Sequence, residues 1–256
     1  METRDLPIAV FDSGVGGISV LREMVRLMPE ENFYFFGDSI HAPYGTKSVE
    51  EVRRLTVDNI SYMAKKGIKA VVIACNTATS AAIKRLRELY TDIPVVGIEP
   101  ALKPAAMEKR GGRVLVLATP MTVQANKFHD LMNRYEDQAT VVPVGCPGLM
   151  EFVENGILEG PQLKAYLREL LEPYLREPVN AVVLGCTHYP FVKETIAYVI
   201  GPGPHIIDGS EGTARELQRR LTEMKLLTSR KTQGEVLFEE SVPEKIKLCK
   251  RLLSLR

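Results

Sequence analysis

Short apolar runs rich in β-branched residues alternate with amphipathic segments along the whole chain. The runs predict strands at IAVF, NFYFFG, AVVIA, VVGI, RVLVLA, VVPVG, AVVLG and HIID. Apolar residues at helical spacing predict helices over residues 48–66, 77–90, 121–135, 161–176, 190–200 and 211–227. This alternation is typical of parallel sheets joined by right-handed crossover helices, so we expect an α/β fold.

Polar residues and glycines follow the carboxyl end of nearly every predicted strand. The segments are DSGVGG, GDSIHAPYG, CNTA, ATPMT, CPG, CTHYP and DGSEG. Ligands of open α/β sheets bind outside the carboxyl ends of the strands. We therefore expect the functional residues at this edge.

Two stretches of the chain nearly repeat each other. AVVIACNTA (residues 70–78) and AVVLGCTHY (residues 181–189) each form an apolar strand that ends in a cysteine, Cys75 or Cys186. A weaker match of IAVFDSGVGG with VLVLATPMTV is expected to place Asp12 and Thr119 in corresponding positions. The repeat predicts two similar parallel-sheet domains related by a pseudo-twofold axis, with the active site between them. Their expected ranges are 1–97 with 208–256, and 98–207.

The amino-acid composition of the chain indicates which kinds of partner it can bind. The chain has 256 residues, with 33 Lys and Arg against 32 Asp and Glu, so no overall charge attracts nucleic acid or an anionic membrane. A small neutral or acidic ligand fits better. No apolar run approaches the roughly 20 residues that span a bilayer, and METRDLPIAVFDSG lacks the features of a signal peptide, so we expect a cytoplasmic protein.

The cysteines fit neither a disulfide scaffold nor a zinc site. There are four of them and none forms a CxxC pair. Cys249 lies on an apolar stripe with helical spacing, so we interpret it as a core residue.

Cys75 lies between a strand end and a helix start. Unpaired backbone N–H groups and the positive end of the helix dipole stabilise a thiolate there, and the thiolate is the form that acts as a base. Asn76 and Thr77 are favoured helix caps, so this segment can also be purely structural. The equivalent context of Cys186 favours function. Two proton carriers on opposite sides of one pocket are what inversion of a carbon centre requires.

Each cysteine has a titratable neighbour. His188, two residues after Cys186, can tune that thiol or shuttle its proton, or can instead cap a turn. Asp12 can serve Cys75 in the same way, or can cap the helix that begins after Gly17.

Two turns are candidates for binding an anion. Gly14, Gly16 and Gly17 permit a close backbone approach at a helix start, but their spacing matches neither a dinucleotide fingerprint nor a P-loop, which favours a carboxylate. The segment from Pro43 to Thr46 exposes backbone N–H groups or is an ordinary turn.

Taken together, these motifs resemble the glutamate racemase family. The matching segments are FDSGVGG, GDS followed by APYG, ACNTA, the TxxTV of ATPMTVQ, CP followed by VE in CPGLMEFVENG, and LGCTHYP, in the family's order. The resemblance implies a cofactor-independent enzyme, without a metal, that interconverts L- and D-glutamate and supplies D-glutamate for peptidoglycan. A homodimer is the default expectation for such an enzyme, and the balanced charge predicts no nucleic-acid or membrane partner.

The resemblance further implies roles for individual residues. Cys75 and Cys186 are then the two bases, assisted by Asp12 and His188, and Glu154 matches a carboxylate near the second thiol, although it can also be a solvated helix residue. The implied substrate contacts are Asp12, Ser13, Tyr44, Gly45, Asn76, Thr77, Thr119, Thr187 and His188.

Other functions stay open at this stage. Pyridoxal phosphate requires a lysine for its Schiff base, and neither Lys47 nor Lys193 lies in a suitable context. Fold and paired cysteines alone do not select the substrate side chain, so a racemase for aspartate or another substrate is one alternative. A binding or redox module whose thiols form a switchable disulfide is the other.

Overall fold

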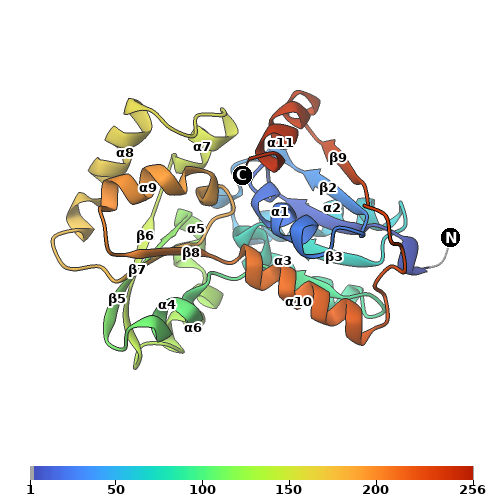
Figure 1. Cartoon of the computed structure of the whole chain (residues 1–256), viewed down its shortest axis with the longest axis horizontal. Coiled ribbons are helices and arrows are strands. Elements are labelled where there is room, and N and C mark those ends of the chain that lie inside the picture. Colours follow the sequence, from blue (N-terminus) through green and yellow to red (C-terminus); the bar gives the residue numbers. More distant parts are fainter. Residues whose placement is uncertain (1–2, 256) are drawn as a thin grey trace. The chain divides into compact units, whose positions relative to one another are not determined.

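The computed structural model describes residues 3–255, apart from the side chain of Lys127. The chain forms two compact units, one made by the chain up to Glu99 together with the segment from Ser210 onward, the other by Pro100–Gly209. Each is built on its own parallel sheet (Figure 1). Residues 1, 2 and 256 of the predicted domain ranges lie outside the described residues. The division into domains stays a prediction, because compactness does not show that either unit folds alone.

The first unit contains a five-stranded sheet in the order β4-β3-β1-β2-β9, with all neighbouring strands parallel. Helix α1 packs against α10 and α11, whereas α2 packs against α3. Right-handed crossovers place these two groups on opposite faces of the sheet. The strands are β1 (Ile8–Asp12), β2 (Phe33–Gly37), β3 (Ala70–Ile73), β4 (Val95–Gly97) and β9 (Val236–Glu240), and the helices are α1 (Ile18–Leu27), α2 (Val49–Ala64), α3 (Asn76–Leu89), α10 (Ser210–Glu223) and α11 (Ile246–Leu253).

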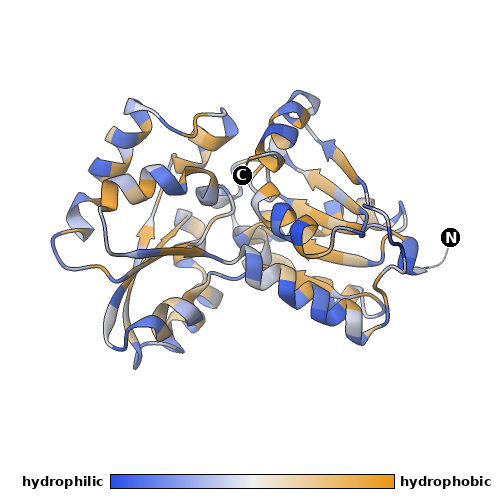
Figure 2. Ribbon diagram, viewed as in Figure 1, coloured by the Kyte–Doolittle hydropathy of each residue, from blue (hydrophilic) through white to orange (hydrophobic). Residues whose placement is uncertain are grey.

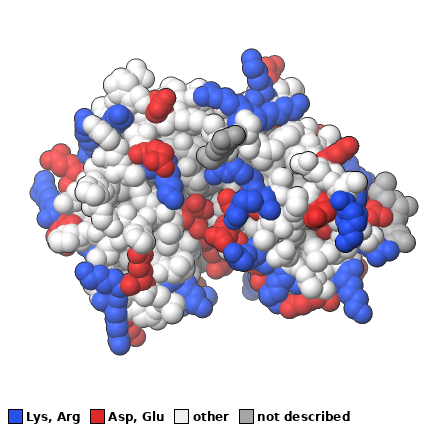
Figure 3. Space-filling model, in the orientation of Figure 1, with Lys and Arg blue, Asp and Glu red and all other residues white. Residues whose placement is uncertain are grey.

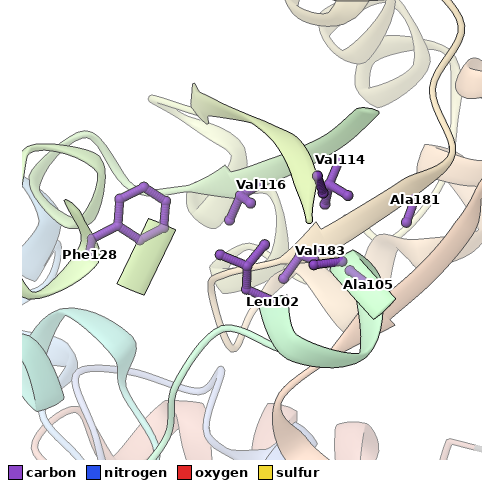
Figure 4. Close-up of a cluster of buried hydrophobic side chains, with 9 residues drawn as sticks. Leu102, Ala105, Val114, Val116, Phe128, Ala181 and Val183 are labelled. Atoms are coloured by element: carbon purple, nitrogen blue, oxygen red, sulfur yellow. The ribbon is translucent and has the colours of Figure 1, made fainter. Parts of the chain in front are cut away.

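The second unit contains a four-stranded parallel sheet in the order β6-β5-β7-β8. Its core includes Leu102 and Phe128, which lie against Val114, Val116 and Val183 of the sheet (Figure 4). The strands are β5 (Gly112–Ala118), β6 (Ala139–Gly145), β7 (Ala181–Leu184) and β8 (His205–Asp208), and the helices are α4 (Leu102–Glu108), α5 (Pro120–Gln124), α6 (Asn126–Asn133), α7 (Leu149–Glu154), α8 (Pro161–Leu171) and α9 (Lys193–Ile200).

Burial explains why the central strands are apolar throughout. Every residue of β1, β2, β3 and β7 is buried. A strand covered by helices on both faces has no solvent side, so its sequence does not alternate. Figure 2 shows the consequence: the strands are largely hydrophobic, whereas the helices carry hydrophilic residues on their outer faces.

The two sheets share one order of strands, β4-β3-β1-β2 matching β8-β7-β5-β6. Even single hydrogen bonds repeat. The backbone N–H of Ala74 donates to Phe11 O at 2.8 Å, and that of Gly185 donates to Leu117 O at 2.7 Å. The internal repeat is thus present in the backbone, and β9 is the one strand of the described chain without a counterpart in the other sheet.

The register corrects one expectation from the repeat. Phe11 pairs with Ile73 in the first sheet, and Leu117 pairs with Leu184 in the second. The residue after Phe11 therefore corresponds to Ala118, and Thr119 corresponds to Ser13. The expected match of Asp12 with Thr119 is wrong by one position.

The predicted helices differ from the observed ones mainly where the backbone leaves helical geometry. The helix expected over 121–135 is two helices, α5 and α6, because Ala125 between them is extended at φ −73° and ψ 134°. The helix expected over 161–176 ends at Leu171 and continues as a 3₁₀ turn over Glu172–Tyr174. Other short 3₁₀ helices span Thr3–Asp5, Ser39–His41, Tyr44–Thr46, Tyr189–Val192 and Pro243–Lys245.

The surface carries both signs of charge. Figure 3 shows basic and acidic side chains interspersed on the face that it displays, with uncharged surface between them. Within residues 3–255, no helix is both long enough and apolar enough to cross a membrane.

Candidate active site

Cys75 sits at the start of α3, where its own thiol caps the helix. Its Sγ accepts a hydrogen bond from the backbone N–H of Ala78 at 3.4 Å and lies 3.3 Å from Ser13 Oγ. Asn76 and Thr77, expected as caps, instead form the first turn of α3. The thiol is thus held at the positive end of a helix, beside a hydroxyl from the turn after β1.

Asn76 has an unsatisfied side chain. It is 5% exposed, and neither its Nδ2 nor its Oδ1 has a hydrogen-bond partner in the described chain. A buried amide without hydrogen-bond partners lowers the stability of the fold, and native proteins seldom contain one. A polar ligand that bonds to both atoms would remove this cost.

Asp12 is fully buried at the end of β1, and its Oδ2 accepts from the backbone N–H of Gly14 at 3.0 Å. Gly17 is needed beside it, because a Cβ on Gly17 would lie 2.6 Å from the Cβ of Asp12. The φ of Gly17 is an ordinary −59°. This glycine therefore permits close packing against the Cβ of Asp12 rather than unusual backbone freedom.

Tyr44 begins a short 3₁₀ helix that also contains Gly45. Its hydroxyl donates to Asp38 Oδ2 at 2.6 Å, and Asp38 in turn donates its backbone N–H to Asp12 O at 3.0 Å. Burial and the nearby Asp38 carboxylate raise the pKa of Tyr44, with a further contribution from Cys75. Tyr44 therefore stays protonated close to the first thiol.

The second unit joins a thiol, an imidazole and a carboxylate. Cys186 Sγ lies 3.7 Å from Nδ1 of His188, and Nε2 of His188 lies 2.7 Å from Glu154 Oε1. The side chains of His188 and Glu154 are 1% and 7% exposed. The alternative of Glu154 as a solvated helix residue is therefore wrong: at the end of α7 its side chain turns inward to the imidazole.

This arrangement favours the charged form of His188. Burial alone lowers the pKa of His188, but the hydrogen bonds and charges of Cys186 and Glu154 outweigh burial and raise it well above 6.5. An imidazolium can donate from both ring nitrogens, one toward Cys186 Sγ and the other to Glu154 Oε1.

Further buried groups surround Cys186. Thr187 is 3% exposed, and the hydroxyl of Tyr189 donates to Cys146 O at 3.3 Å. Burial, together with the nearby Cys186, raises the pKa of Cys146 to about 12, so Cys146 stays a thiol. All four cysteines are buried.

Thr119 caps a helix. Its Oγ1 accepts from the backbone N–H of Thr122 at 3.2 Å and lies 2.9 Å from Thr122 Oγ1. The register places Thr119 at the carboxyl edge of the second sheet, as it places Ser13 in the first.

The structure thus gathers the expected residues into two groups, one in each unit, both at the carboxyl edge of their sheet. The first group contains Asp12, Ser13, Tyr44, Gly45, Cys75, Asn76 and Thr77, and the second contains Thr119, Glu154, Cys186, Thr187 and His188. In the described residues, no cluster of three or more His, Cys, Asp or Glu side chains could hold a metal ion.

Sequence analysis missed Asp38, Tyr189 and Cys146. Asp38 and Cys146 directly follow β2 and β6, and each donates its backbone N–H to the equivalent carbonyl, Asp12 O or Ala118 O. The positions of Asp38 and Cys146 after matching strands were the signal in the sequence that could have identified these two residues.

Comparison with known proteins gives a consistent result. The family model described as Asp/Glu/Hydantoin racemase matches residues 8–237. A curated glutamate racemase from Clostridium perfringens is 49% identical over 257 aligned positions, which cover 100% of this chain and 99% of the relative.

Solved structures agree in fold over nearly the whole chain. A glutamate racemase isoform from Bacillus anthracis has 31% identity and a TM-score of 0.89, covering 99% of this chain and 96% of its own. Glutamate racemase from Francisella tularensis in complex with D-glutamate has 28% identity and a TM-score of 0.86, covering 99% and 95%.

Proposed function

Because the chain belongs to the Asp/Glu/hydantoin racemase family, we propose that it interconverts L-glutamate and D-glutamate by proton transfer between two cysteines. One observation carries the proposal: each of the two matching sheets ends in a buried cysteine with a polar assistant beside it. The Francisella relative, solved with D-glutamate, supports the choice of substrate.

In the proposed reaction, the thiolate of one cysteine removes the α-proton and forms an S–H bond. The thiol of the other cysteine gives its proton to the opposite face of the same carbon. Cys75 and Cys186 exchange roles when the direction reverses. Each turnover leaves the enzyme in the form that suits the reverse reaction, so protons must exchange before the next turnover in the same direction.

The two thiols are supported differently. Cys75 accepts the Ala78 N–H at the start of α3 and lies beside Ser13. Cys186 faces a charged His188 that Glu154 fixes from the other side. We propose that Asp12 and His188 assist the two proton transfers.

The carbanion intermediate requires fixed electrostatic stabilisation in a site that excludes water. The unsatisfied amide of Asn76 offers one donor and one acceptor for the substrate. We propose that Asn76, Thr77, Ser13, Tyr44 and Gly45 bind it from the first unit, and Thr119, Thr187 and His188 from the second.

The wider role is also a proposal. A racemase of this kind would supply D-glutamate for peptidoglycan in the cytoplasm, would use no cofactor and would act as a homodimer. The full-length similarity to glutamate racemases supports the activity, and the family resemblance supports the rest.

A polarimetric assay with both enantiomers of glutamate and of aspartate tests the substrate. We expect the optical rotation of both glutamate enantiomers to decay to zero and aspartate to react far more slowly. Faster aspartate turnover would favour the related aspartate activity. Ligand binding without turnover, together with loss of two titratable thiols on mild oxidation, would favour a redox module.

Cysteine variants in heavy water test the mechanism. We expect the wild-type chain to place deuterium on the α-carbon of the product, and Cys75→Ala and Cys186→Ala each to abolish racemisation in both directions. Near-normal turnover by either variant, or an unlabelled product, would contradict the two-base scheme.

A further inference from the structure

Asp38 is a buried carboxylate that the proposed mechanism does not use. It follows β2, is 2% exposed, and is bonded by three different side chains. The hydroxyl of Tyr44 and Nδ2 of Asn59 donate to its Oδ2 at 2.6 and 2.9 Å, and Nδ1 of His41 lies 2.8 Å from its Oδ1.

These contacts close one segment of chain on itself. Asp38 and Tyr44 stand at the two ends of the GDSIHAPYG segment, and Asn59 attaches the segment to α2. The backbone N–H of Asp38 donates to Asp12 O at 3.0 Å, which links the same residue to the carboxyl end of β1. Asp38 therefore fixes the place of Tyr44 and of the Tyr44–Thr46 turn relative to Asp12.

A carboxylate accepts from all three partners at once when Nδ1 of His41 carries its proton. Asp⁻ is purely an acceptor with about four lone-pair sites, whereas an asparagine has one acceptor oxygen and adds two donors. Keeping a charge in a buried place is costly unless every bond to it is made. Because the Tyr44 hydrogen points to Asp38, the phenol oxygen can only accept a hydrogen bond from any other group.

We infer that Asp38 is a positioning residue for substrate binding, which acts by holding Tyr44 and the turn that follows it. Asp38 itself exchanges no proton with the substrate. The inference rests on the proposed function, because Tyr44 and Gly45 are substrate contacts only if that proposal is correct.

A purely electrostatic role of Asp38 would change KM in the opposite direction when its charge is removed. Glutamate is an anion, so removing a nearby negative charge would strengthen its binding and lower KM. Loss of positioning weakens binding and raises KM. The direction of the change in KM therefore separates the two roles.

The experiment is steady-state kinetics of Asp38→Asn with both glutamate enantiomers. We expect KM to rise about tenfold, as for loss of a hydrogen bond to a charged group, while kcat changes less than about threefold. The two enantiomers have equal free energies, so kcat/KM must fall by the same factor in both directions.

A double-mutant cycle with Tyr44→Phe tests whether Asp38 acts through that tyrosine. If it does, adding Asp38→Asn to Tyr44→Phe raises KM by less than about twofold more. If Asp38→Asn does not fold, Asn59→Ala removes a single donor, and we expect a smaller KM rise in the same direction.

Glu239→Gln provides the matched control. Glu239 also accepts from tyrosine hydroxyls, of Tyr34 at 2.5 Å and Tyr62 at 2.6 Å, but none of these residues belongs to the proposed site. We expect Glu239→Gln to lower stability and leave KM unchanged.

An unchanged or lowered KM in Asp38→Asn, a change confined to kcat, or full additivity with Tyr44→Phe would overturn the inference. Activity of the wild-type chain on glutamate separates failure of the proposed function from failure of the role inferred for Asp38. If the wild-type chain does not racemise glutamate, the proposed function fails and the inference falls with it. If it does and KM is unaffected, only the inference fails.

Discussion

His188 carries the charge that distinguishes the two groups of residues from each other. It lies between Cys186 and Glu154 and is almost completely buried. In the first unit the thiol faces a neutral hydroxyl and a backbone N–H instead. The matching backbone therefore supports two different electrostatic environments around the two thiols.

Replacing Glu154 should shift the titration of His188. Because the pKa of His188 is raised in the folded state, its charged contacts stabilise the fold fully below its unfolded pKa of about 6.5, and this stabilisation is lost as the pH rises through the raised value. In Glu154→Gln one source of the raised pKa is gone, so the pKa of His188 falls and the loss of stability is complete at a lower pH. NMR titration of the imidazole measures the shift. The exposed Glu151→Gln on the same helix is the control, and an unchanged His188 titration in Glu154→Gln would contradict this explanation.

Gly185 leaves no room for a side chain just before Cys186. A Cβ there would lie 3.0 Å from Leu117 O and 3.2 Å from the Cβ of Ala118. We expect Gly185→Ala to destabilise the chain by about 1–3 kcal/mol through overpacking and to lower kcat by displacing the thiol. Urea unfolding and initial rates measure both effects. Gly212→Ala, in helix α10 with open space around it, should instead stabilise by about 0.5–1 kcal/mol.

At the residue scale, the sequence predicted residues beside strand ends better than it predicted contacts between residues far apart in the chain. Cys75, Cys186 and Asp12 stand beside recognisable strand ends, so their placement follows from local pattern. The partner of His188 is 34 positions away in sequence, and the Asn59 contact to Asp38 spans 21 positions. Such pairs depend on how helices pack on the sheet, which no local pattern specifies.

Strand β9 is the strand that sequence analysis missed in the described residues. Its sequence VLFEE has three apolar residues followed by two glutamates, and it forms the edge of the first sheet beside β2. An edge strand is not covered on both faces, so it lacks the continuous apolar run that marked the others. By contrast, all eight predicted strands formed, because each is bounded by turn residues and most are apolar throughout.

The side chain of Glu239 connects β9 to β2 and α2 by hydrogen bonds. Its carboxylate accepts from Tyr34, Tyr62 and Lys66. Burial opposes its ionisation, but these bonds hold the pKa of Glu239 below 4.5. We expect Glu239→Gln to lose about 1 kcal/mol at pH 7, since the site is partly exposed.

The pH dependence of that loss has a definite sign. A carboxyl with a lowered folded pKa contributes stability above its unfolded pKa and loses it as the pH falls through the folded value. The stability difference between wild type and Glu239→Gln should therefore be full above pH about 4.5 and shrink below it. Urea unfolding at several pH values measures it. A difference that grew towards acid would contradict the assignment.

At the scale of the whole molecule, the second unit is an uninterrupted insertion in the first. Pro100–Gly209 contains every strand of its own sheet and its own apolar core. The first unit, in contrast, needs β9, α10 and α11 from the end of the chain.

We therefore predict that a fragment of residues 100–209 folds alone and unfolds cooperatively in urea, as small single domains do. A chain that stops at residue 209 should lose the cooperative transition of the first unit, because its sheet lacks an edge strand and two helices. Far-UV circular dichroism during urea titration measures both. A fragment with no cooperative transition would show that the second unit depends on the first.

The position of β9 in the sequence also determines the order in which the two sheets can be completed during synthesis. Phe33 on β2 cannot pair with Val236 on β9 until the residues between them, including the whole inserted unit, have left the ribosome. The inserted unit emerges in full before that moment and can fold while the surrounding one is still incomplete. During synthesis, the first sheet is therefore completed only after the inserted unit has emerged, and until then β2 keeps an open edge that a chaperone or a neighbouring nascent chain can reach.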